Sequence, residues 1–282
     1  MIGWANRKFH RLGAALTLLA LLASSLAGAA PLARAAAPAN SDFYNTWART
    51  DLPVAQQVVN RTWLWAPEAF TVAFWEEYAE SPGGFRAVQY FDKSRMEIND
   101  PGAVNDGVWF VTNGLLVVEM IEGKLQAGDG TFHPRPASGV PVAGDPDDTS
   151  GPTYAALDRH RPSVGDRTGQ TLTTRIARDG ATAEDPSLAE LGISFAFYDD
   201  VTGHNIAAPF WDFMRSRGTV YQAGQYVEDQ LFLNEFYATG RPITEPFFAD
   251  VKVGNQVRLV LLQCFERRCL TYTPDNPEGW QV

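Results

Sequence analysis

The sequence contains only two cysteines among 282 residues, and no long apolar stretch follows its first 35 residues. So few cysteines exclude a disulfide framework, and the stability of the chain must come from a hydrophobic core. A membrane-spanning helix needs about 20 predominantly apolar residues, and no segment beyond the N-terminal region provides them. The sequence therefore predicts a mature chain without a transmembrane segment.

The N-terminus has the pattern of a secretory signal peptide. Three basic residues between Arg7 and Arg11 precede an almost wholly apolar stretch, which passes through small residues to Ala33-Arg34-Ala35. This order of basic, apolar and small residues is typical of a cleaved signal peptide, and the apolar core is short for a membrane anchor. We expect residues 1–35 to be removed and residues 36–282 to be secreted or otherwise extracytoplasmic.

The composition is acidic. Removal of residues 1–35 takes away four basic side chains and no acidic one, which leaves 19 basic against 33 acidic side chains and a net charge of −14. Nucleic acids and anionic membranes are bound through Lys and Arg, so this balance argues against both as partners. It is compatible with divalent cations or with neutral glycans.

A short motif occurs twice. Residues 88–99 (VQYFDKSRMEIN) match residues 262–273 (LQCFERRCLTYT) at an offset of 174, with Gln, Phe, an acid and a base at corresponding positions. Further matches precede each copy in the same order, namely Phe74-Trp75 with Phe247-Phe248, Phe43–Thr46 with Phe236–Thr239, and Pro53-Val54 with Pro242-Ile243. We interpret these matches as an internal repeat of one supersecondary unit, in too few copies for a solenoid.

Each copy is predicted to belong to a β-hairpin. In the second copy, residues 247–253 alternate between apolar and polar, Gly254-Asn255 can form a tight turn, and residues 257–265 form an apolar strand. In the first copy, residues 81–84 (SPGG) provide the turn of a hairpin over residues 70–91.

Two helices are expected between the hairpins. One runs from Leu115 to Glu122 with Asn113 as its cap, and one runs from Asn205, as its own cap, to Arg217. Residues 128–162 are rich in Gly, Pro and Asp and are predicted to be a long loop. The predicted fold class is α+β, mainly antiparallel β built from two pseudo-repeated hairpin units with a few helices. Residues 36–282 are expected to form a single domain of two halves, which are joined by the loop over residues 128–162.

These motifs together resemble a family of uncharacterised exported domains from green non-sulfur bacteria and their relatives. The resemblance is carried by Val88–Asn99, Thr112–Leu116, Gly144-Asp145-Pro146, His204-Asn205, Pro242–Glu245 and Phe265–Arg268. It implies no known reaction, and members of the family sometimes accompany cell-envelope modules. Members usually run on past Val282, so the last strand of this chain is expected to be incomplete.

The two cysteines, Cys264 and Cys269, are predicted to be unlinked. If they lie on one strand, a separation of five residues points their side chains to opposite faces, too far apart for a disulfide. The resemblance implies the same, because members of the family commonly carry Val at both positions. We therefore expect two buried, apolar side chains.

The repeat motif carries dense charge. Asp92 and Arg95 in the first copy, and Glu266, Arg267 and Arg268 in the second, could flank a cleft and bind an acidic or sugar ligand through their guanidinium groups. The alternative is structural: each acid accepts hydrogen bonds from an arginine or from loop amides within its own half. The structural role is the preferred interpretation.

Three residues are candidates for catalysis. His204 follows two acidic residues, and a histidine with a nearby carboxylate can act as a general base. Glu97 and Glu266 could belong to a carboxylate pair of the kind that glycoside hydrolases use, whose separation is a three-dimensional quantity. The chain has no G-x-S-x-G and no H-E-x-x-H motif, so neither a nucleophile elbow nor a typical zinc site is indicated.

One acidic segment is a candidate metal site. Asp145, Asp147 and Asp148 resemble the start of a calcium loop. The EF-hand spacing fails, because the sixth position is not Gly and the twelfth is not Glu. An irregular calcium site and a solvated turn both remain open, and no cofactor is predicted.

Two tryptophans are candidate sugar-stacking residues. Trp63 and Trp65 lie two positions apart, so on a strand they would share one face. Exposed, they could stack on a sugar ring, whereas burial in the core is the commoner use of such a pair.

The sequence favours a non-catalytic secreted or cell-envelope module that binds a glycan or another surface component. Its basis is the export pattern, the acidity, the abundant aromatic residues and the missing catalytic motifs. An extracellular hydrolase that uses His204 or a carboxylate pair is the alternative. A purely structural spacer is a third hypothesis.

Overall fold

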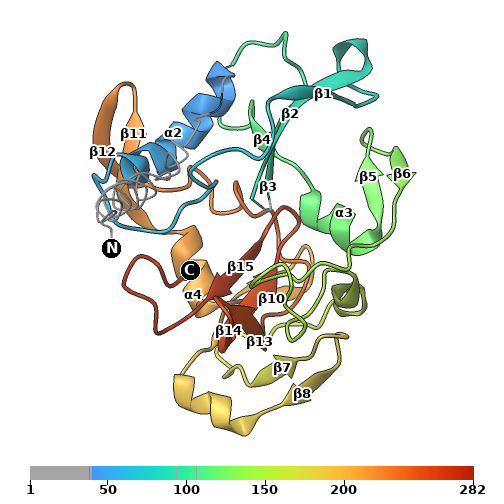
Figure 1. Cartoon of the computed structure of the whole chain (residues 1–282), viewed down its shortest axis with the longest axis vertical. Helices are drawn as coiled ribbons and strands as arrows, with labels where there is room; N and C mark the ends of the chain where they lie inside the picture. The colour runs from blue at the N-terminus through green and yellow to red at the C-terminus, as the bar shows by residue number, and fades with distance from the viewer. Residues whose placement is uncertain (1–37, 39, 93, 106) are drawn as a thin grey trace, which may run out of the picture. The chain divides into compact units, whose positions relative to one another are not determined.

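The computed structural model describes Pro38 and residues 40–92, 94–105 and 107–282 (Figure 1). The predicted signal peptide lies outside the described residues, as does Lys93 of the repeat motif. The described strands are mostly antiparallel and form several small sheets, with short helices between them. The predicted α+β class is therefore confirmed.

Helix α2 (Ser41–Ala55) precedes all the strands and is absent from the predicted elements. Asn40 caps it, because its side-chain oxygen accepts hydrogen bonds from the N–H groups of Asp42 and Phe43 at 2.9 and 3.1 Å. One side of the helix buries Phe43 and Trp47 in a hydrophobic core. The helix is thereby fixed to the first sheet of the chain.

That first sheet has four antiparallel strands in the order β1-β2-β3-β4. One of its faces carries core side chains such as Phe91 and Met96, and the opposite face carries Arg86 and Arg95. Strands β1 and β2 form the predicted first hairpin, although its first strand is shorter than expected. The strand bounds are β1 (Phe74–Glu77), β2 (Phe85–Phe91), β3 (Ser94–Ile98) and β4 (Thr112–Asn113).

The second sheet has five strands in the order β15-β14-β13-β7-β8. Strands β13 and β14 form the predicted second hairpin, and only the contact of β13 with β7 is parallel. Both faces of β14 are covered, because Leu262 packs in one core cluster and its neighbour Leu261 in another. The bounds are β7 (Thr174–Ile176), β8 (Thr182–Glu184), β13 (Phe247–Val253), β14 (Gln256–Cys264) and β15 (Cys269–Tyr272).

The repeat motif occupies corresponding positions in these two sheets. Gln89 pairs with Met96 in the first sheet, and Gln263 pairs with Leu270, 174 positions later in both cases. The preceding aromatic residues also correspond, since Phe74 pairs with Val88 and Phe247 with Leu262. The weaker upstream match differs in structure: residues 43–46 lie in α2, whereas residues 236–239 form turns. The correspondence is thus limited to two three-stranded units.

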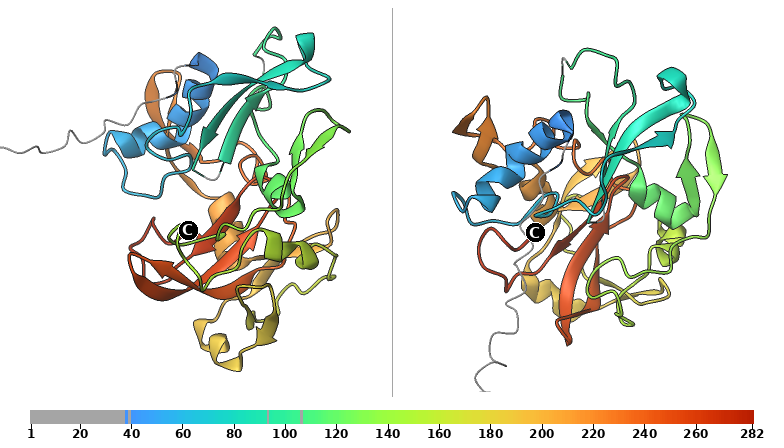
Figure 2. Two further views of the ribbon diagram at one scale, coloured as in Figure 1. Left: turned by 45° about the vertical axis from the view of Figure 1, so that its right-hand side comes forward. Right: turned by 45° about the horizontal axis from the view of Figure 1, so that its top comes forward.

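The remaining elements are short. Helix α3 matches the first predicted helix, but Asn113 is not its cap, because Asn113 lies in β4 and donates to the carbonyl of Tyr237 at 3.0 Å. The second predicted helix begins later than expected, since Asn205 lies in β10 and Pro209 opens α4. Figure 2 shows α2 beside the β11–β12 ribbon. The bounds are α3 (Leu116–Glu122), β5 (Lys124–Gln126), β6 (Phe132–Pro134), β9 (Phe195–Asp199), β10 (His204–Ala207), α4 (Ala208–Met214), β11 (Arg217–Gln222) and β12 (Gln225–Gln230), with 3₁₀ helices at Pro82–Gly84, Ala155–His160 and Pro186–Leu191.

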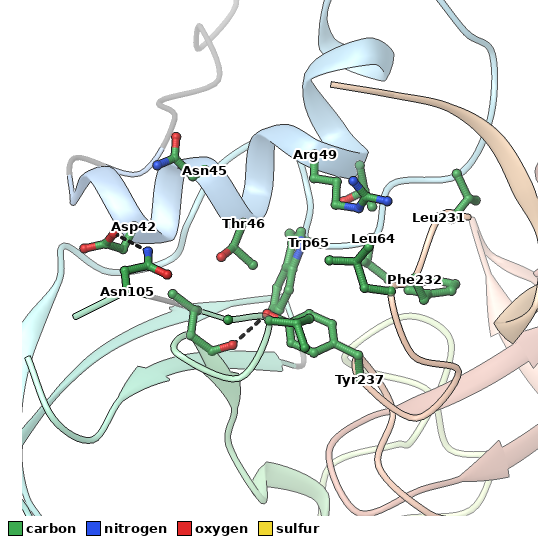
Figure 3. A pocket seen from close by; sticks show the side chains of 15 residues that line it. Asp42, Asn45, Thr46, Arg49, Leu64, Trp65, Asn105, Leu231, Phe232 and Tyr237 are labelled. Carbon is green, nitrogen blue, oxygen red and sulfur yellow. Dashed lines mark hydrogen bonds between the residues drawn. The ribbon is translucent and has the colours of Figure 1, made fainter. Parts of the chain in front are cut away.

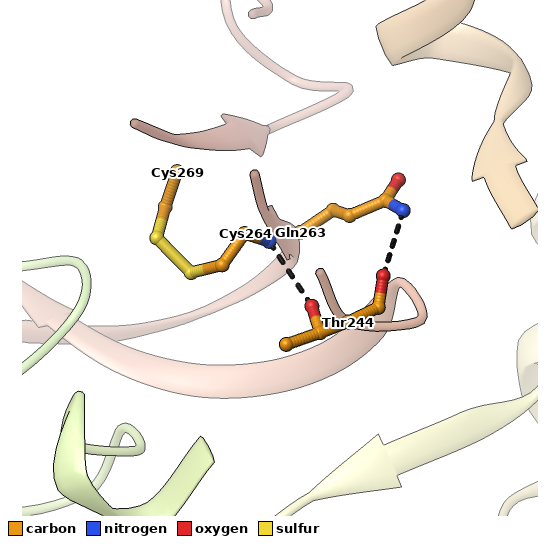
Figure 4. The surroundings of a disulfide bond; sticks show 4 residues. All are labelled: Thr244, Gln263, Cys264 and Cys269. Carbon is orange, nitrogen blue, oxygen red and sulfur yellow. Dashed lines mark hydrogen bonds between the residues drawn. A yellow bond between two sulfur atoms is a disulfide. The ribbon is translucent and has the colours of Figure 1, made fainter. Parts of the chain in front are cut away.

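Cys264 and Cys269 form a disulfide bond (Figure 4). The prediction of unlinked thiols was wrong, because the two residues do not share a strand. Strand β14 ends at Cys264, the chain reverses over the next four residues, and β15 begins at Cys269. The cysteines are therefore opposite each other on adjacent strands, with their Cα atoms 4.0 Å apart.

Candidate binding site

The three catalytic candidates lie in different local environments. His204 is in β10, Glu97 is in β3, and Glu266 follows β14. Each is engaged by its own neighbours, and none of the hydrogen bonds or ion pairs among the described residues joins two of the three. The fold therefore does not assemble them into one catalytic group.

His204 is buried and both of its ring nitrogens face acceptor oxygens. Nδ1 lies 3.3 Å from Oε1 of Glu245, and Nε2 lies 2.9 Å from the carbonyl oxygen of Arg161. The same Glu245 oxygen accepts the backbone N–H of Asn205 at 2.9 Å. His204 thus joins β10 to neighbouring segments, and each ring nitrogen already faces an acceptor oxygen of the protein.

Glu97 belongs to a buried ionic network on the first sheet, called here the β-sheet network (Arg86, Arg95, Glu76, Glu97, Glu119 and Tyr90). Nε of Arg95 donates to Oε1 of Glu97 at 2.6 Å, and Nη1 of Arg86 lies 3.2 Å from the same oxygen. Arg95 also binds both carboxylate oxygens of Glu119 on α3, at 2.8 and 2.9 Å. The network therefore holds α3 against the sheet.

The opposite charges in this network stabilise one another in their ionised forms. Burial alone would lower the pKa of Arg95, but Glu97 and Glu119 raise it well above its usual value. Burial also raises the pKa of Tyr90 to about 12, and its hydroxyl donates to Glu76 at 2.9 Å. A side chain at Gly114 would collide with Arg95 and Glu97, so glycine is required where the chain passes over the network.

The other described charged residues of the repeat motif lie in different local environments. Glu266 is half-buried, and its Oε2 accepts the backbone N–H of Arg241 at 3.0 Å, as the structural interpretation expects. Its counterpart Asp92 is exposed. Arg267 is half-buried, and its backbone N–H donates to Thr239 at 2.9 Å.

Arg268 is buried and joins segments that are far apart in the sequence. It donates to the carbonyl oxygens of Leu64 and Ala238 at 2.6 and 2.9 Å, and to the side-chain oxygen of Asn113 at 3.2 Å. Its guanidinium lies 4.9 Å from the centre of the Trp65 ring, within cation–π range. Burial lowers its pKa to about 10. Arg268 is thus a positioning residue for the Leu64–Trp65 segment, not an exposed ligand-binding group.

Asp51 holds the same segment from the side of α2. It is fully buried, and its two carboxylate oxygens accept the N–H groups of Leu64 and Trp65 at 3.0 and 2.7 Å. Burial raises the pKa of Asp51 from 3.8 to about 6, against the lowering effect of these hydrogen bonds. Asp51 and Arg268 together fix Trp65 in place.

A cavity of about 200 Å³, called here the α2 pocket, lies beside this segment (Figure 3). Residues 42, 45, 46 and 49 of α2 line one wall, a spacing that places them on one face of the helix. Figure 3 shows the Trp65 ring between these α2 side chains and Tyr237. The other lining residues include Leu64, Asn105, Val108, Val111, Leu231 and Phe232.

The α2 pocket combines polar groups with an apolar interior. Nδ2 of Asn105 donates to Oδ1 of Asp42 at 2.9 Å, which links the loop before β4 to α2. The hydroxyl of Tyr237 donates to the carbonyl of Val111 at 2.7 Å. Figure 3 shows both hydrogen bonds at the cavity. The cavity therefore offers amide, hydroxyl and carboxylate groups next to aromatic and aliphatic carbon.

Two donors beside the α2 pocket are buried without a partner. Nε1 of Trp65 and Nε of Arg49 have no hydrogen bond to any described residue. Arg49 uses its other nitrogens to hold β12, through Asp229 at 3.0 Å and the carbonyl of Gln230 at 2.7 Å. A buried donor without a partner is costly, and both of these donors lie below the surface of the pocket wall.

Trp65 does not act as the exposed stacking platform that the sequence analysis considered. Trp63 and Trp65 lie outside the strands, so the argument that they share a strand face does not apply. Trp65 is only 1% exposed, and Trp63 is half-buried against the same core. Of the two, Trp65 lines the α2 pocket, with its ring inside the fold.

The three aspartates of the candidate calcium loop point to different partners. Asp145 accepts the N–H of Gly254 at 3.2 Å, and Asp147 pairs with Lys252 at 2.6 Å. Asp148 is buried and accepts the N–H groups of the two residues after Thr149. No group of three or more His, Cys, Asp or Glu suited to a metal ion occurs in the described parts of the chain.

Comparisons with models of protein families, with curated proteins and with solved structures find no match. The resemblance to a family of exported domains therefore stays a prediction. The function has to be inferred from the geometry of the α2 pocket and from the chemistry of the residues that line it.

Proposed function

We propose that the protein is a non-catalytic, exported module that binds a neutral glycan in the α2 pocket. The observation that carries the proposal is the lining of this cavity. The nearly buried rings of Trp65 and Tyr237 back the cavity, and the exposed Leu233 provides accessible apolar carbon. Asn45, Asn105 and Thr46 provide amide and hydroxyl groups. A sugar ring has apolar C–H faces and a polar edge of hydroxyl groups, and this combination of side chains complements both.

The carboxylate inventory of the pocket supports binding rather than hydrolysis. Asp42 is the only acidic side chain that lines it among the described residues, and it is hydrogen-bonded to Asn105. Glycoside hydrolysis ordinarily needs two carboxyl groups on either side of the scissile bond. His204, Glu97 and Glu266 do not line the cavity, so no observation favours the hydrolase alternative.

Two features support a location outside the cytoplasm. The N-terminal residues have the pattern of a signal peptide. The Cys264–Cys269 disulfide is of a kind that persists in oxidising compartments and is rare in the cytosol. Secretion or attachment to the cell envelope is therefore part of the proposal.

The charge of the protein supports a neutral ligand. With a net charge of −10 for the whole chain, phosphate-rich polymers are disfavoured. No helix in the described ranges combines the length and the apolarity needed to cross a bilayer. The partner that fits best is an uncharged polysaccharide outside the cell.

The proposal is tested by titrating the purified protein with a panel of soluble neutral polysaccharides and with peptidoglycan fragments. Asn45 is exposed on α2 and lines the pocket, so Asn45→Ala should weaken binding by roughly three- to tenfold through a lost hydrogen bond. Gln225→Ala removes a matched exposed amide on β12, outside the pocket, and should bind like the parent. Absence of binding to every glycan, or equal losses in both variants, would refute the proposal.

A further inference from the structure

We infer that the α2 pocket is one of two adjoining subsites, so that the ligand is a chain of two or more sugar units rather than a single sugar. This inference rests on the proposed function and specifies the ligand of the same site. Its starting point is a second cavity of about 280 Å³ next to the first. Asp42 lines both cavities, which places them on either side of the start of α2.

The second cavity has the same mixture of polar and aromatic groups. Asn40 and Asp42 contribute polar groups from the start of α2, and Trp75 and Phe110 contribute aromatic carbon. The lining therefore repeats the chemistry of the α2 pocket at a neighbouring position.

Trp75 is the residue that distinguishes this cavity. It lies on the edge strand β1 and is 60% exposed, although tryptophan side chains are highly buried on average. Trp75 pairs with Ala87, so the two side chains lie on the same face of the sheet. Ala87 belongs to the hydrophobic core and also lines the second cavity, so this is the face on which the cavity lies. An exposed indole beside polar groups is suited to stacking on a sugar ring.

The sizes of the cavities favour a ligand that spans both. Ligand pockets generally have volumes of about 300–1,000 Å³. The two cavities, of about 200 and 280 Å³, each fall below this range and reach it only together. Asp42 places an acceptor carboxylate at their boundary, where it favours hydroxyl donors and disfavours acidic sugars. The structure thus fits a neutral oligosaccharide with units on both sides of Asp42.

The experiment measures affinity for a series of oligosaccharides of one to six units, taken from a polysaccharide that the protein binds. Affinity should rise by about tenfold once the chain is long enough to occupy both subsites. Trp75→Ala should abolish most of this gain. Phe85→Ala removes another exposed aromatic residue (51%) of the same sheet, outside both cavities, and should keep the full gain.

The outcomes separate the two proposals. If the parent protein binds all lengths equally, or if Trp75→Ala keeps the dependence on length, the two-subsite inference is wrong while the proposed function stands. If no glycan of the panel binds, the proposed function itself is wrong. Circular dichroism of Trp75→Ala and Phe85→Ala shows that both variants are folded before their affinities are compared.

Discussion

Replacing Arg95 by methionine should destabilise the fold more than any surface substitution. Arg95 is fully buried and makes charge-assisted hydrogen bonds to Glu97 and to both oxygens of Glu119. Methionine fills a similar volume but leaves these two buried carboxylates short of a partner. The β-sheet network would then lose the arginine that ties α3 to β3.

The size of the stability loss in Arg95→Met depends on the contacts that Glu97 and Glu119 keep. Breaking a buried ion pair by removing one partner costs about 3–5 kcal/mol. Glu97 keeps Arg86 at 3.2 Å, and Glu119 keeps the N–H of Gln126 at 3.0 Å. We therefore expect a loss of about 4 kcal/mol, out of a total that for a typical domain is about 5–15 kcal/mol. For a domain of this size that corresponds to a fall in Tm of about 8–16 °C.

Equilibrium unfolding in urea measures this loss. Arg217→Met is the matched control, because Arg217 is 64% exposed and 3.9 Å from its acidic partner, so its loss should change stability by about 0.5 kcal/mol or less. The double variant Arg95→Met/Glu119→Gln should recover part of the loss by removing an unpaired charge. If Arg95→Met costs no more than Arg217→Met, the network does not hold α3 in the way proposed.

Three further predictions concern stability. Replacing Cys264 and Cys269 together by Val should cost about 2 kcal/mol, the entropy of a loop this short, and an intact mass that is unchanged by reduction would contradict the disulfide. Burial raises the folded pKa of Asp51 to about 6 from 3.8, so the folded state binds this proton more tightly. The parent should therefore gain roughly 2 kcal/mol over Asp51→Asn as pH falls from 7 to 4, and a gain as pH rises would contradict it. Glu97→Ala should lower Tm clearly, because it leaves buried arginines short of a partner. Glu266→Ala removes one hydrogen bond at a half-buried site and should cost about 1 kcal/mol of stability. A larger loss of stability in Glu266→Ala than in Glu97→Ala would contradict the assignment of Glu97 to the network.

The strands of the repeat units could be predicted from the sequence because their determinants are local. Alternation of apolar residues and the Gly254-Asn255 turn indicated the β13–β14 hairpin, and the SPGG segment indicated the β1–β2 hairpin. Helix α2 had a comparable local pattern, with Asn40 as cap and Phe43 and Trp47 one turn apart on one face. Residues 43–46 also match residues 236–239, which form turns, so the repeat pattern and the helical pattern gave conflicting predictions for this segment.

The disulfide and the role of Glu97 could not be predicted, because both depend on where the chain reverses. Cys264 and Cys269 approach each other only if the strand ends between them. Glu97 is buried because α3 covers its face of the sheet and brings Glu119 to Arg95. Neither contact has a signature in residue spacing along one strand.

The candidate site was inaccessible to sequence analysis for a related reason. The α2 pocket is built by α2, the Leu64–Trp65 segment, the loop around Asn105 and the segment before Tyr237, which are distant in sequence. Arg268 appeared in the sequence as part of a charged strand end. In the fold it is buried because Leu64, Ala238 and Asn113 supply acceptors from three other segments. Of the predicted ligand-binding residues, Trp65 alone lines the α2 pocket.

The most direct test of glycan binding in the α2 pocket is the ¹H–¹⁵N signal of the Trp65 indole. The chain has eight tryptophans, so Trp65→Phe identifies the signal by its loss. Titration with a neutral oligosaccharide should shift the Trp65 signal, because Trp65 lines the α2 pocket and a bound sugar would change the surroundings of its ring. The signal of Trp211, which stacks on Phe197 in a different core cluster, should stay in place. A ligand that binds and leaves the Trp65 signal unmoved would contradict the assignment of the site.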